Sequence, residues 1–429
     1  MKTRFHLVSL GCDKNLSDSE KILRMATERG LEITDDPSEA DVILVNTCAF
    51  ILDAQDESVQ TILAMAEVKK PNAELIVSGC LAERYKEEIM KEIPEVTRVI
   101  TNAELQDRLF EEHITKRIVT TGGHYAYLKI AEGCDKMCTY CIIPYLRGHY
   151  RSVPMEDLLK EATELALEGV KELILVAQET TIYGKDLYGK KALPELLTKL
   201  SGIDGIRWIR VMYMYPEEIT EELLDVMASL PKVCHYFDIP VQHASDAVLR
   251  AMGRRTDAAE LKRVITMIRN KMPDAALRTT LISGFPGETK EDHRILMEFV
   301  KETDFDRLGV FCYSREDGTP AAERMDQIEG SVKEQRRDEI MRLQQKLAFQ
   351  KAAKRKGKQY DVIVEGRLPE EEGNVHVGRT YMDAPDVDGY IYFDAEEKSL
   401  MTGDMVRVRV TGSNEYDLIG EVMTECLKK

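Results

Sequence analysis

The feature that most constrains the fold is a repeated alternation of short apolar runs with helix-like stretches. In the first third of the chain the apolar runs lie at residues 5–10, 41–46 and 74–78. The helical stretches that follow them lie at residues 17–29, 53–69 and 82–92. Buried strands that alternate with helices favour a parallel sheet with helices on both faces. We therefore expect an α/β fold that begins with a doubly wound parallel sheet.

Each of these three predicted strands ends at a cysteine, namely Cys12, Cys48 and Cys80. In an open parallel sheet, ligands bind beyond the carboxyl ends of the strands. The three thiols should therefore converge, although about thirty residues separate each from the next. Cys12 and Cys80 follow glycine, which allows the backbone to pass close to a bulky ligand. Chance placement of three buried thiols is the less favoured alternative.

A second, longer series of strand–helix units follows. Its predicted strands lie at residues 125–131, 172–178, 208–213, 236–241, 277–283 and 308–313. Its predicted helices include residues 155–168, 217–229, 246–270 and 290–302. Six such units in about 190 residues predict an incomplete (β/α)6 barrel with its site at the carboxyl ends of the strands.

The pattern changes after this series. A charged helix at about residues 331–356 ends in the basic sequence KAAKRKGK, for which a solvated connecting helix is favoured over a binding element. Residues 359–429 form short alternating stretches separated by turns, which predict a small all-β barrel or sandwich. This tail is acidic, with sixteen Asp and Glu against seven Lys and Arg.

Composition excludes several classes of protein. The formal charge of −17 over 429 residues argues against broad binding to nucleic acid. No apolar run is long enough to span a membrane, and no signal peptide is recognisable, so we expect a cytoplasmic protein. Nine cysteines without an export signal do not suggest disulfides. For Cys234, Cys312 and Cys426 we expect no special role.

The strongest chemical signal is the CxxxCxxC sequence formed by Cys134, Cys138 and Cys141, directly after a predicted strand. Thiolates are the ligands that iron–sulfur clusters require, and three ligands leave one iron of a four-iron cluster open to a small molecule such as S-adenosylmethionine. Zinc is the alternative, but zinc usually requires a fourth Cys or His at a matching spacing. Tyr140, just before the last cysteine, would shield the cluster or face the adenine.

At these residues the chain resembles the radical S-adenosylmethionine methylthiotransferases, and the resemblance covers nearly its whole length. The resemblance implies an N-terminal methylthiotransferase domain (1–120), a radical S-adenosylmethionine domain (121–357) and a C-terminal TRAM domain (358–429). It implies two [4Fe-4S] clusters, one held by Cys134, Cys138 and Cys141. The second, auxiliary cluster would be held by Cys12, Cys48 and Cys80.

The resemblance also implies contacts with S-adenosylmethionine. These fall on polar residues and a glycine after later strands, in addition to Tyr140: Gln178, Glu179, Thr180, Gln242, His243, Ser283 and Gly284. Turn formation and helix capping are the alternative roles for such residues.

Three motifs favour the branch of the family that modifies a ribosomal protein over the branch that modifies transfer RNA. They are SLGCDKNLSDSE (9–20), VAQETTIYGKDLYG (176–189) and DIPVQHASDAVLRAMGRR (238–255). Asp13 departs from the proline that is usual after the first cysteine. The implied reaction adds a methylthio group to the β-carbon of an aspartate in small-subunit ribosomal protein twelve.

The implied partners are that ribosomal protein, docked partly by the acidic TRAM domain, and a reductant protein of the flavodoxin or ferredoxin type. Direct binding of nucleic acid is not expected. Two alternatives remain open. One is methylthiolation of an adenosine in transfer RNA, for which only the KAAKRKGK helix end and Lys136, Arg147 and Arg151 look suited to phosphate. The other is a non-catalytic iron–sulfur electron carrier or sensor.

Overall fold

The computed structural model describes residues 2–369, 374–395 and 400–423, so Cys426 lies outside the described residues. The N-terminal part is a five-stranded parallel sheet in the order β2-β1-β3-β4-β5. Its strands are β1 (Arg4–Ser9), β2 (Glu32–Ile33), β3 (Val42–Thr47), β4 (Glu74–Gly79) and β5 (Arg98–Thr101). The sequence predicted β1, β3 and β4 and missed the two edge strands.

Helices cover both faces of this sheet. They are α1 (Asp13–Glu28), α2 (Leu52–Val68), α3 (Cys80–Arg84), α4 (Lys86–Glu92) and α5 (Asn102–Glu111). Neighbouring strand residues face opposite sides: Val45 packs in one core with Ile62 of α2, whereas Leu44 packs in another with Leu23 of α1 and Leu105 of α5. The predicted doubly wound sheet is thereby confirmed.

Six further parallel strands form an open half-barrel. They are β6 (Tyr125–Lys129), β9 (Glu172–Val176), β10 (Trp208–Val211), β11 (Tyr236–Asp238), β12 (Ala276–Ser283) and β13 (Arg307–Cys312). They form two three-stranded sheets, joined by a parallel bridge between Ile209 and Val233. The predicted incomplete barrel is confirmed, because the strands follow one another in sequence order and β13 does not pair with β6.

The helices of the half-barrel pack on the outer side of its strands. They are α7 (Met155–Leu167), α9 (Leu193–Ser201), α10 (Glu221–Ser229), α11 (Asp246–Ala251), α12 (Ala258–Lys271), α13 (Lys290–Thr303) and α14 (Gly330–Ala353). The short α8 (Lys185–Tyr188) contributes no buried residue to this core. One prediction was wrong: the single helix expected at 246–270 is two helices, α11 and α12. The break falls at Gly253, whose φ of +72° is a left-handed conformation that ends a helix.

The C-terminal tail is a closed five-stranded barrel in the order β14-β15-β16-β18-β17. Its strands are β14 (Gln359–Arg367), β15 (Val375–Thr380), β16 (Ile391–Asp394), β17 (Met405–Asn414) and β18 (Asp417–Val422). All pairs are antiparallel except β16 with β18. The predicted small all-β barrel is therefore confirmed.

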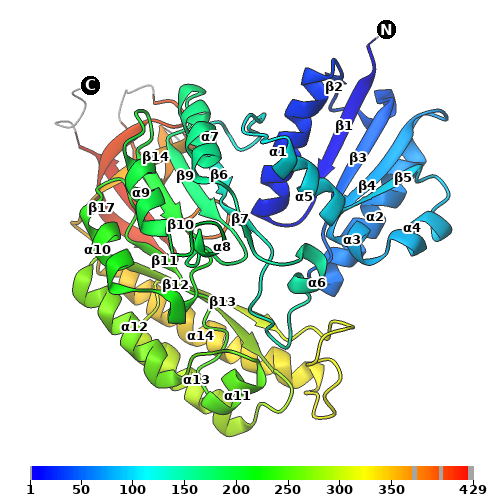
Figure 1. Cartoon of the computed structure of the whole chain (residues 1–429). Helices are drawn as coiled ribbons and strands as arrows, with labels where there is room; N and C mark the ends of the chain where they lie inside the picture. Colours follow the sequence, from blue (N-terminus) through cyan, green and yellow to red (C-terminus); the bar gives the residue numbers. More distant parts are fainter. Residues whose placement is uncertain (1, 370–373, 396–399, 424–429) are drawn as a thin grey trace.

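The three parts are arranged around the half-barrel. In Figure 1 the N-terminal sheet (blue) and the C-terminal barrel (red) lie on opposite sides of it. Within the described residues, no helix is long and apolar enough to cross a membrane.

Candidate active site

Three cysteines follow adjacent strands of the N-terminal sheet. Cys12 lies between β1 and α1, Cys48 follows β3, and Cys80 begins α3 directly after β4. Because β1, β3 and β4 are neighbours in the sheet, the three thiols lie at the same edge. Gly11 has a φ of +86°, and a Cβ on it would lie only 2.6 Å from Cys48 Cβ. The loop that carries Cys12 therefore passes directly against Cys48.

Burial favours the protonated form of two of these thiols, Cys48 and Cys80. Burial raises the pKa of Cys80 to about 11 and raises the pKa of Cys48, and the neighbouring Cys12 raises both further. The guanidinium of Arg147 acts in the opposite direction on both pKa values. A thiol with a pKa of about 11, such as that of Cys80, is protonated at neutral pH and unreactive unless a metal binds the thiolate.

The CxxxCxxC loop lies between two short paired strands, β7 (Ala131–Glu132) and β8 (Arg151–Ser152). It leads from β7 into the short helix α6 (Ile143–Arg147), which precedes β8. Burial raises the pKa of Cys134 to about 11 and that of Cys141 to about 12. Gly133 has a φ of +77°, and a Cβ there would overlap the carbonyl oxygen of His149. The start of the loop is thus pressed against the far side of the hairpin.

Aromatic rings surround the loop. The ring of Tyr140 packs edge-on against Phe285, with 6.4 Å between ring centroids. The hydroxyl of Tyr215 lies 3.8 Å from Cys138 Sγ, and the guanidinium of Arg254 lies 4.3 Å from the Tyr215 ring. Tyr215 and Arg254 were not foreseen, because they lie far along the sequence in loops after β10 and α11.

The loop after β9 carries Gln178, Glu179 and Thr180. Gln178 Nε2 donates to Glu132 Oε1 at 3.3 Å. Burial raises the pKa of Glu179 to about 7, although Lys136 lies 3.3 Å from its Oε2 atom and opposes the shift. Thr180 Oγ1 donates at 2.7 Å to the backbone carbonyl that follows β10. Of the three, Thr180 therefore ties two strand ends together, Glu179 is paired with Lys136, and Gln178 keeps its Oε1 atom available.

The remaining candidate residues follow the later strands of the half-barrel, and most of them make contacts within the protein. Gln242 adopts a left-handed φ of +68° in a bridge to β12. Burial lowers the pKa of His243 to about 3, so its ring is neutral, and Nδ1 accepts a 2.9 Å hydrogen bond from a backbone N–H. Ser283 Oγ donates to the carbonyl of Lys333 in α14 at 3.0 Å, and a Cβ on Gly284 would collide with the Lys333 side chain. The end of β12 is thus closed by α14.

Gln178 Oε1, a buried oxygen in the loop after β9, has no hydrogen-bond partner among the described residues, and neither has His243 Nε2. Glu179 Oε2 faces Lys136 Nζ at 3.3 Å. Buried polar atoms are normally satisfied, so an unpaired acceptor such as Gln178 Oε1 marks a place where a donor can bind. An acceptor of this kind suits the amino group of a methionyl moiety. The residues present therefore fit S-adenosylmethionine.

No group of three His, Cys, Asp or Glu side chains in the described part of the chain is arranged to hold a single metal ion. A four-iron cube spaces its thiolate ligands more widely than one ion does, because each thiolate binds a different iron. The donor set of each site, three cysteines that are buried or half-buried, therefore fits an iron–sulfur cluster.

Arg147 links the two cysteine sites. It is the last residue of α6, six positions after Cys141. Its Nη1 atom donates to Glu132 Oε1 at 3.0 Å, its Nη2 atom donates to Asn15 Oδ1, and its positive charge lowers the pKa of Cys80. Asn15, Glu132 and Arg147 were not predicted as site residues, because nothing local in the sequence brings them together.

Two residues considered for phosphate binding do not serve that purpose. Arg147 is buried in the contacts just described, and Lys136 forms ion pairs with Glu218 at 2.6 Å and with Glu179. Only Arg151 of this group is exposed, where it pairs with Asp107. Arg147 and Lys136 are therefore not free to bind phosphate, which removes two of the residues that the transfer-RNA alternative would use.

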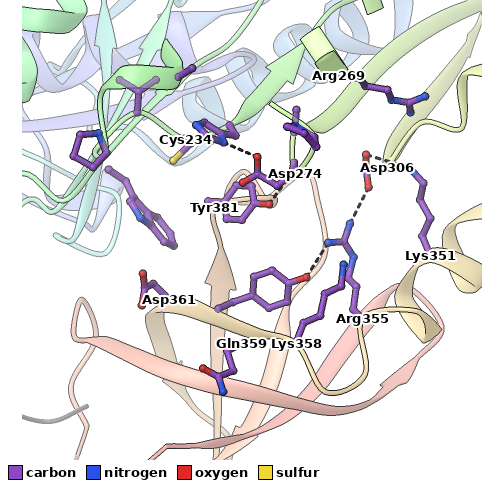
Figure 2. Close-up of a pocket in the computed structure, with 18 of the residues that line it drawn as sticks. Cys234, Arg269, Asp274, Asp306, Lys351, Arg355, Lys358, Gln359, Asp361 and Tyr381 are labelled. Carbon is purple, nitrogen blue, oxygen red and sulfur yellow. Dashed lines mark hydrogen bonds and ion pairs between the residues drawn. The ribbon is translucent and has the colours of Figure 1, made fainter. Parts of the chain in front are cut away.

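A cavity of about 1050 Å³ lies elsewhere, at the amino ends of the half-barrel strands and against the C-terminal barrel (Figure 2). Its walls include Cys234 and Tyr381, and Arg355 pairs with Asp306 across it at 2.8 Å. None of the six cysteines of the two sites lines it. Cys234 therefore belongs to neither cysteine site.

Three family models match successive parts of the chain. Residues 4–101 match "Uncharacterized protein family UPF0004", residues 128–300 match the radical SAM superfamily, and residues 357–423 match the TRAM domain. The fold also resembles that of the radical S-adenosylmethionine methyltransferase TsrM from Kitasatospora setae, with a TM-score of 0.56 and 14% sequence identity. That likeness covers 75% of this chain and 77% of TsrM.

Much closer relatives are found among curated proteins. The chain is 55% identical to "Ribosomal protein uS12 methylthiotransferase RimO" from Lachnoclostridium phytofermentans, over 97% of this chain and 99% of that protein. It is 49% identical to the protein of that name from Acetivibrio thermocellus, over the full length of both.

The fold, the CxxxCxxC loop and the matched domains define a radical S-adenosylmethionine enzyme with a C-terminal TRAM domain, a class that uses an iron–sulfur cluster together with S-adenosylmethionine. Within that class, the identity over nearly the whole length shows that this chain belongs to the RimO family of methylthiotransferases.

Proposed function

We propose that the protein adds a methylthio group to the β-carbon of an aspartate in ribosomal protein uS12. The support is its identity of 44–55% with several proteins that carry that activity in their names, each aligned over 97% or more of this chain. The observation that carries the proposal is the pair of three-cysteine sites joined through Arg147, since both transferred sulfur and radical chemistry must reach one substrate.

The proposal includes two [4Fe-4S] clusters. Cys134, Cys138 and Cys141 would hold the one that works with S-adenosylmethionine. The auxiliary cluster would lie on the three strand-end cysteines of the N-terminal sheet: Cys12, Cys48 and Cys80. When bound, these groups supply the one-electron chemistry, the radical and the sulfur.

The protein's own residues would position and shield the reactants. Gln178 would orient the methionyl amino group through its unpartnered Oε1 atom, and Glu179, paired with Lys136, would lie beside it. Gln242 and His243 would line the opposite side of the site, and Ser283 and Gly284 would hold the end of β12 against α14. Tyr140, backed by Phe285, would exclude water from the CxxxCxxC loop.

The domain limits proposed are 1–120, 121–357 and 358–429. The first limit falls between the end of α5 at Glu111 and the start of β6 at Tyr125, and the second between α14 and β14. The acidic TRAM domain would dock a basic ribosomal protein, with its sixteen acidic residues against eight basic ones. Electrons would come from a small flavodoxin- or ferredoxin-type protein in the cytoplasm.

The cluster count is tested by iron analysis after anaerobic purification and reconstitution. We expect about eight irons in the wild type and about four in a Cys134→Ala/Cys138→Ala/Cys141→Ala variant, since one Cys-ligated cube is lost. Cys234→Ala, which removes a buried cysteine outside both sites, should keep about eight. About four irons in the wild type and none in the triple variant would leave the auxiliary cluster without support.

The substrate is tested by incubating the reconstituted enzyme, S-adenosylmethionine and strong reductant with uS12 or with transfer RNA. We expect the mass increase of a methylthio group on an aspartate of uS12 and none on the RNA. Modification of the RNA alone would overturn the substrate assignment. No 5′-deoxyadenosine despite two intact clusters would indicate an electron carrier or sensor.

A further inference from the structure

The contacts of Arg147 carry an inference about how the protein controls its N-terminal cysteine site. Only 1% of its side chain is exposed, and burying a guanidinium is costly unless partners compensate its charge. Glu132 supplies both carboxylate oxygens, at 3.0 and 3.2 Å from Nη1. The rest of the guanidinium points across the domain junction, toward Asn15 and Cys80.

The partners of Arg147 are themselves fixed. Asn15 Nδ2 donates at 2.9 Å to the carbonyls of Leu10 and Thr47, which precede Cys12 and Cys48. Glu132 accepts a further hydrogen bond from Lys129 Nζ at 2.9 Å. The guanidinium therefore has little freedom to move away from Cys80, since hydrogen bonds anchor the residues on either side of it.

The charge on Glu132 is shared. Lys129 also pairs with Asp18, so two cations, Arg147 and Lys129, face two carboxylates in this buried network. The network is neutral without the thiolates. A negatively charged metal group on the cysteines would therefore meet a guanidinium whose charge is only partly taken up by Glu132.

We propose that Arg147 is a positioning residue that raises the reduction potential of the cluster held by Cys12, Cys48 and Cys80. The proposal rests on the proposed function for the presence of that cluster. One-electron reduction adds a negative charge to the cluster. A cation fixed beside one of its sulfur ligands stabilises the reduced form more than the oxidised form, because charge around a cluster is a known determinant of its potential.

A purely structural role is the competing explanation. Arg147 joins α6 of the half-barrel to α1 of the N-terminal sheet, and its loss would loosen the junction in either case. Stability therefore does not discriminate between the two roles. The reduction potential does, because a residue that only ties the domains together leaves the potential of a correctly assembled cluster unchanged.

The experiment uses the full chain with Cys134→Ala/Cys138→Ala/Cys141→Ala, so that only the N-terminal cysteines can hold a cluster. The protein is reconstituted without oxygen and titrated with dithionite, and the reduced cluster is followed by electron paramagnetic resonance. We compare this protein with versions that also carry Arg147→Met, Arg147→Lys or Arg151→Met. Arg151 is the matched control, an exposed arginine four residues away that contacts none of the cysteines.

At a fixed applied potential, Arg147→Met should lower the ratio of reduced to oxidised cluster about tenfold, a shift of about 59 mV for one electron. Arg147→Lys keeps the charge but loses the planar fork, so it should shift the ratio less. Arg151→Met should leave the ratio unchanged. An unchanged ratio in Arg147→Met, with its iron content intact, would overturn the proposal.

Glu132→Gln provides a test if Arg147→Met does not retain iron. Removing this carboxylate leaves the charge of Arg147 less compensated, so the reduced fraction should rise rather than fall. No rise would overturn the proposal. Absence of iron from the starting triple variant would instead overturn the auxiliary cluster itself, and with it both the proposed function and this inference.

Discussion

The half-barrel is joined to its two neighbours in opposite ways. Toward the N-terminal sheet, the junction is a buried network of charged and amide groups, in which Lys129 of β6 contacts Asp18 of α1 and Gln106 of α5. Toward the C-terminal barrel, one continuous apolar core crosses the junction, with Ile174 and Trp208 from the half-barrel packed with Val362 and Phe393 of the barrel.

The C-terminal junction also contains charge, but in a different form. Glu172 of β9 pairs at 2.8 Å with Arg210 of β10 and at 2.8 Å with Arg379 of β15, and all three side chains are fully buried. Apolar side chains of the shared core surround the three. From Arg379 the charges continue to Glu365 and His124, away from the cysteine sites, whereas the charges of the N-terminal junction continue into Arg147 and the cysteine site.

The difference indicates that one junction mainly stabilises the protein and the other mainly fixes the orientation of two domains. Apolar area stabilises in proportion to the surface it buries and does not depend strongly on orientation. Buried charges contribute little net stability, yet they require specific geometry. The junction that sets the relative position of the two cysteine sites is the polar one, and the junction with the acidic barrel is the apolar one.

The largest expected effect is at the C-terminal junction. Glu172→Gln leaves Arg210 and Arg379 buried without their shared carboxylate, and we expect a loss of about 3–5 kcal/mol in the free energy of unfolding. Urea denaturation followed by fluorescence of Trp208, the single tryptophan of the chain, reports directly on this junction. Arg24→Ala, which breaks an exposed pair with Glu28, is the control and should cost less than about 1 kcal/mol.

At the N-terminal junction, Lys129→Met leaves Asp18 and Glu132 without their shared cation and should cost about 3 kcal/mol. Replacing Asp18 as well, in Lys129→Met/Asp18→Leu, should recover part of that loss, because an apolar pair can substitute for an ion pair in stability. Hydrogen exchange of the α1 amides should nevertheless stay faster than in wild type, since the fixed geometry is lost. If the double variant regained both the wild-type free energy of unfolding and the wild-type exchange rate, the polar junction would not be needed to fix the geometry.

His243, a buried titratable group outside both junctions, should make the free energy of unfolding depend on pH independently of the charges at the junctions. His243 has a native pKa of about 3, against 6.5 for the unfolded chain, so the unfolded chain binds an extra proton between these values. The free energy of unfolding should therefore fall as the pH decreases from about 6.5 toward 3, by about 2 kcal/mol at pH 5.

His243→Asn removes this titration but keeps an acceptor for the backbone N–H that His243 Nδ1 now binds. The acid loss of stability in the variant should be smaller than in wild type by about the same 2 kcal/mol at pH 5. His149→Asn, at a fully exposed side chain, is the control and should follow the wild-type curve. Identical pH profiles for wild type and His243→Asn would show that the buried ring does not contribute.

Much of the fold followed from local patterns. Apolar runs such as residues 41–46 and 74–78 became β3 and β4 with shifts of one residue at their ends. The carboxyl ends of these strands carry Cys48 and Cys80, as the sequence predicted. The edge strand β2 escaped detection because it has only two residues, both exposed, and therefore has no apolar pattern.

The sequence by itself determined the order of strands and helices, the strand-end positions of Cys12, Cys48 and Cys80, and the CxxxCxxC loop. These depend on hydrophobic periods of two and 3.6 residues and on ligand spacing, which are local properties.

Only the tertiary structure decided which polar residues are buried. Residues 13–21 resemble the exposed start of a surface helix, yet Asn15, Asp18 and Lys21 are all buried against the half-barrel. The partners of Arg147 and of Glu172 likewise come from distant segments. Counter-charges across a domain junction have no period in the sequence, because their pairing depends on how two separately folded surfaces meet.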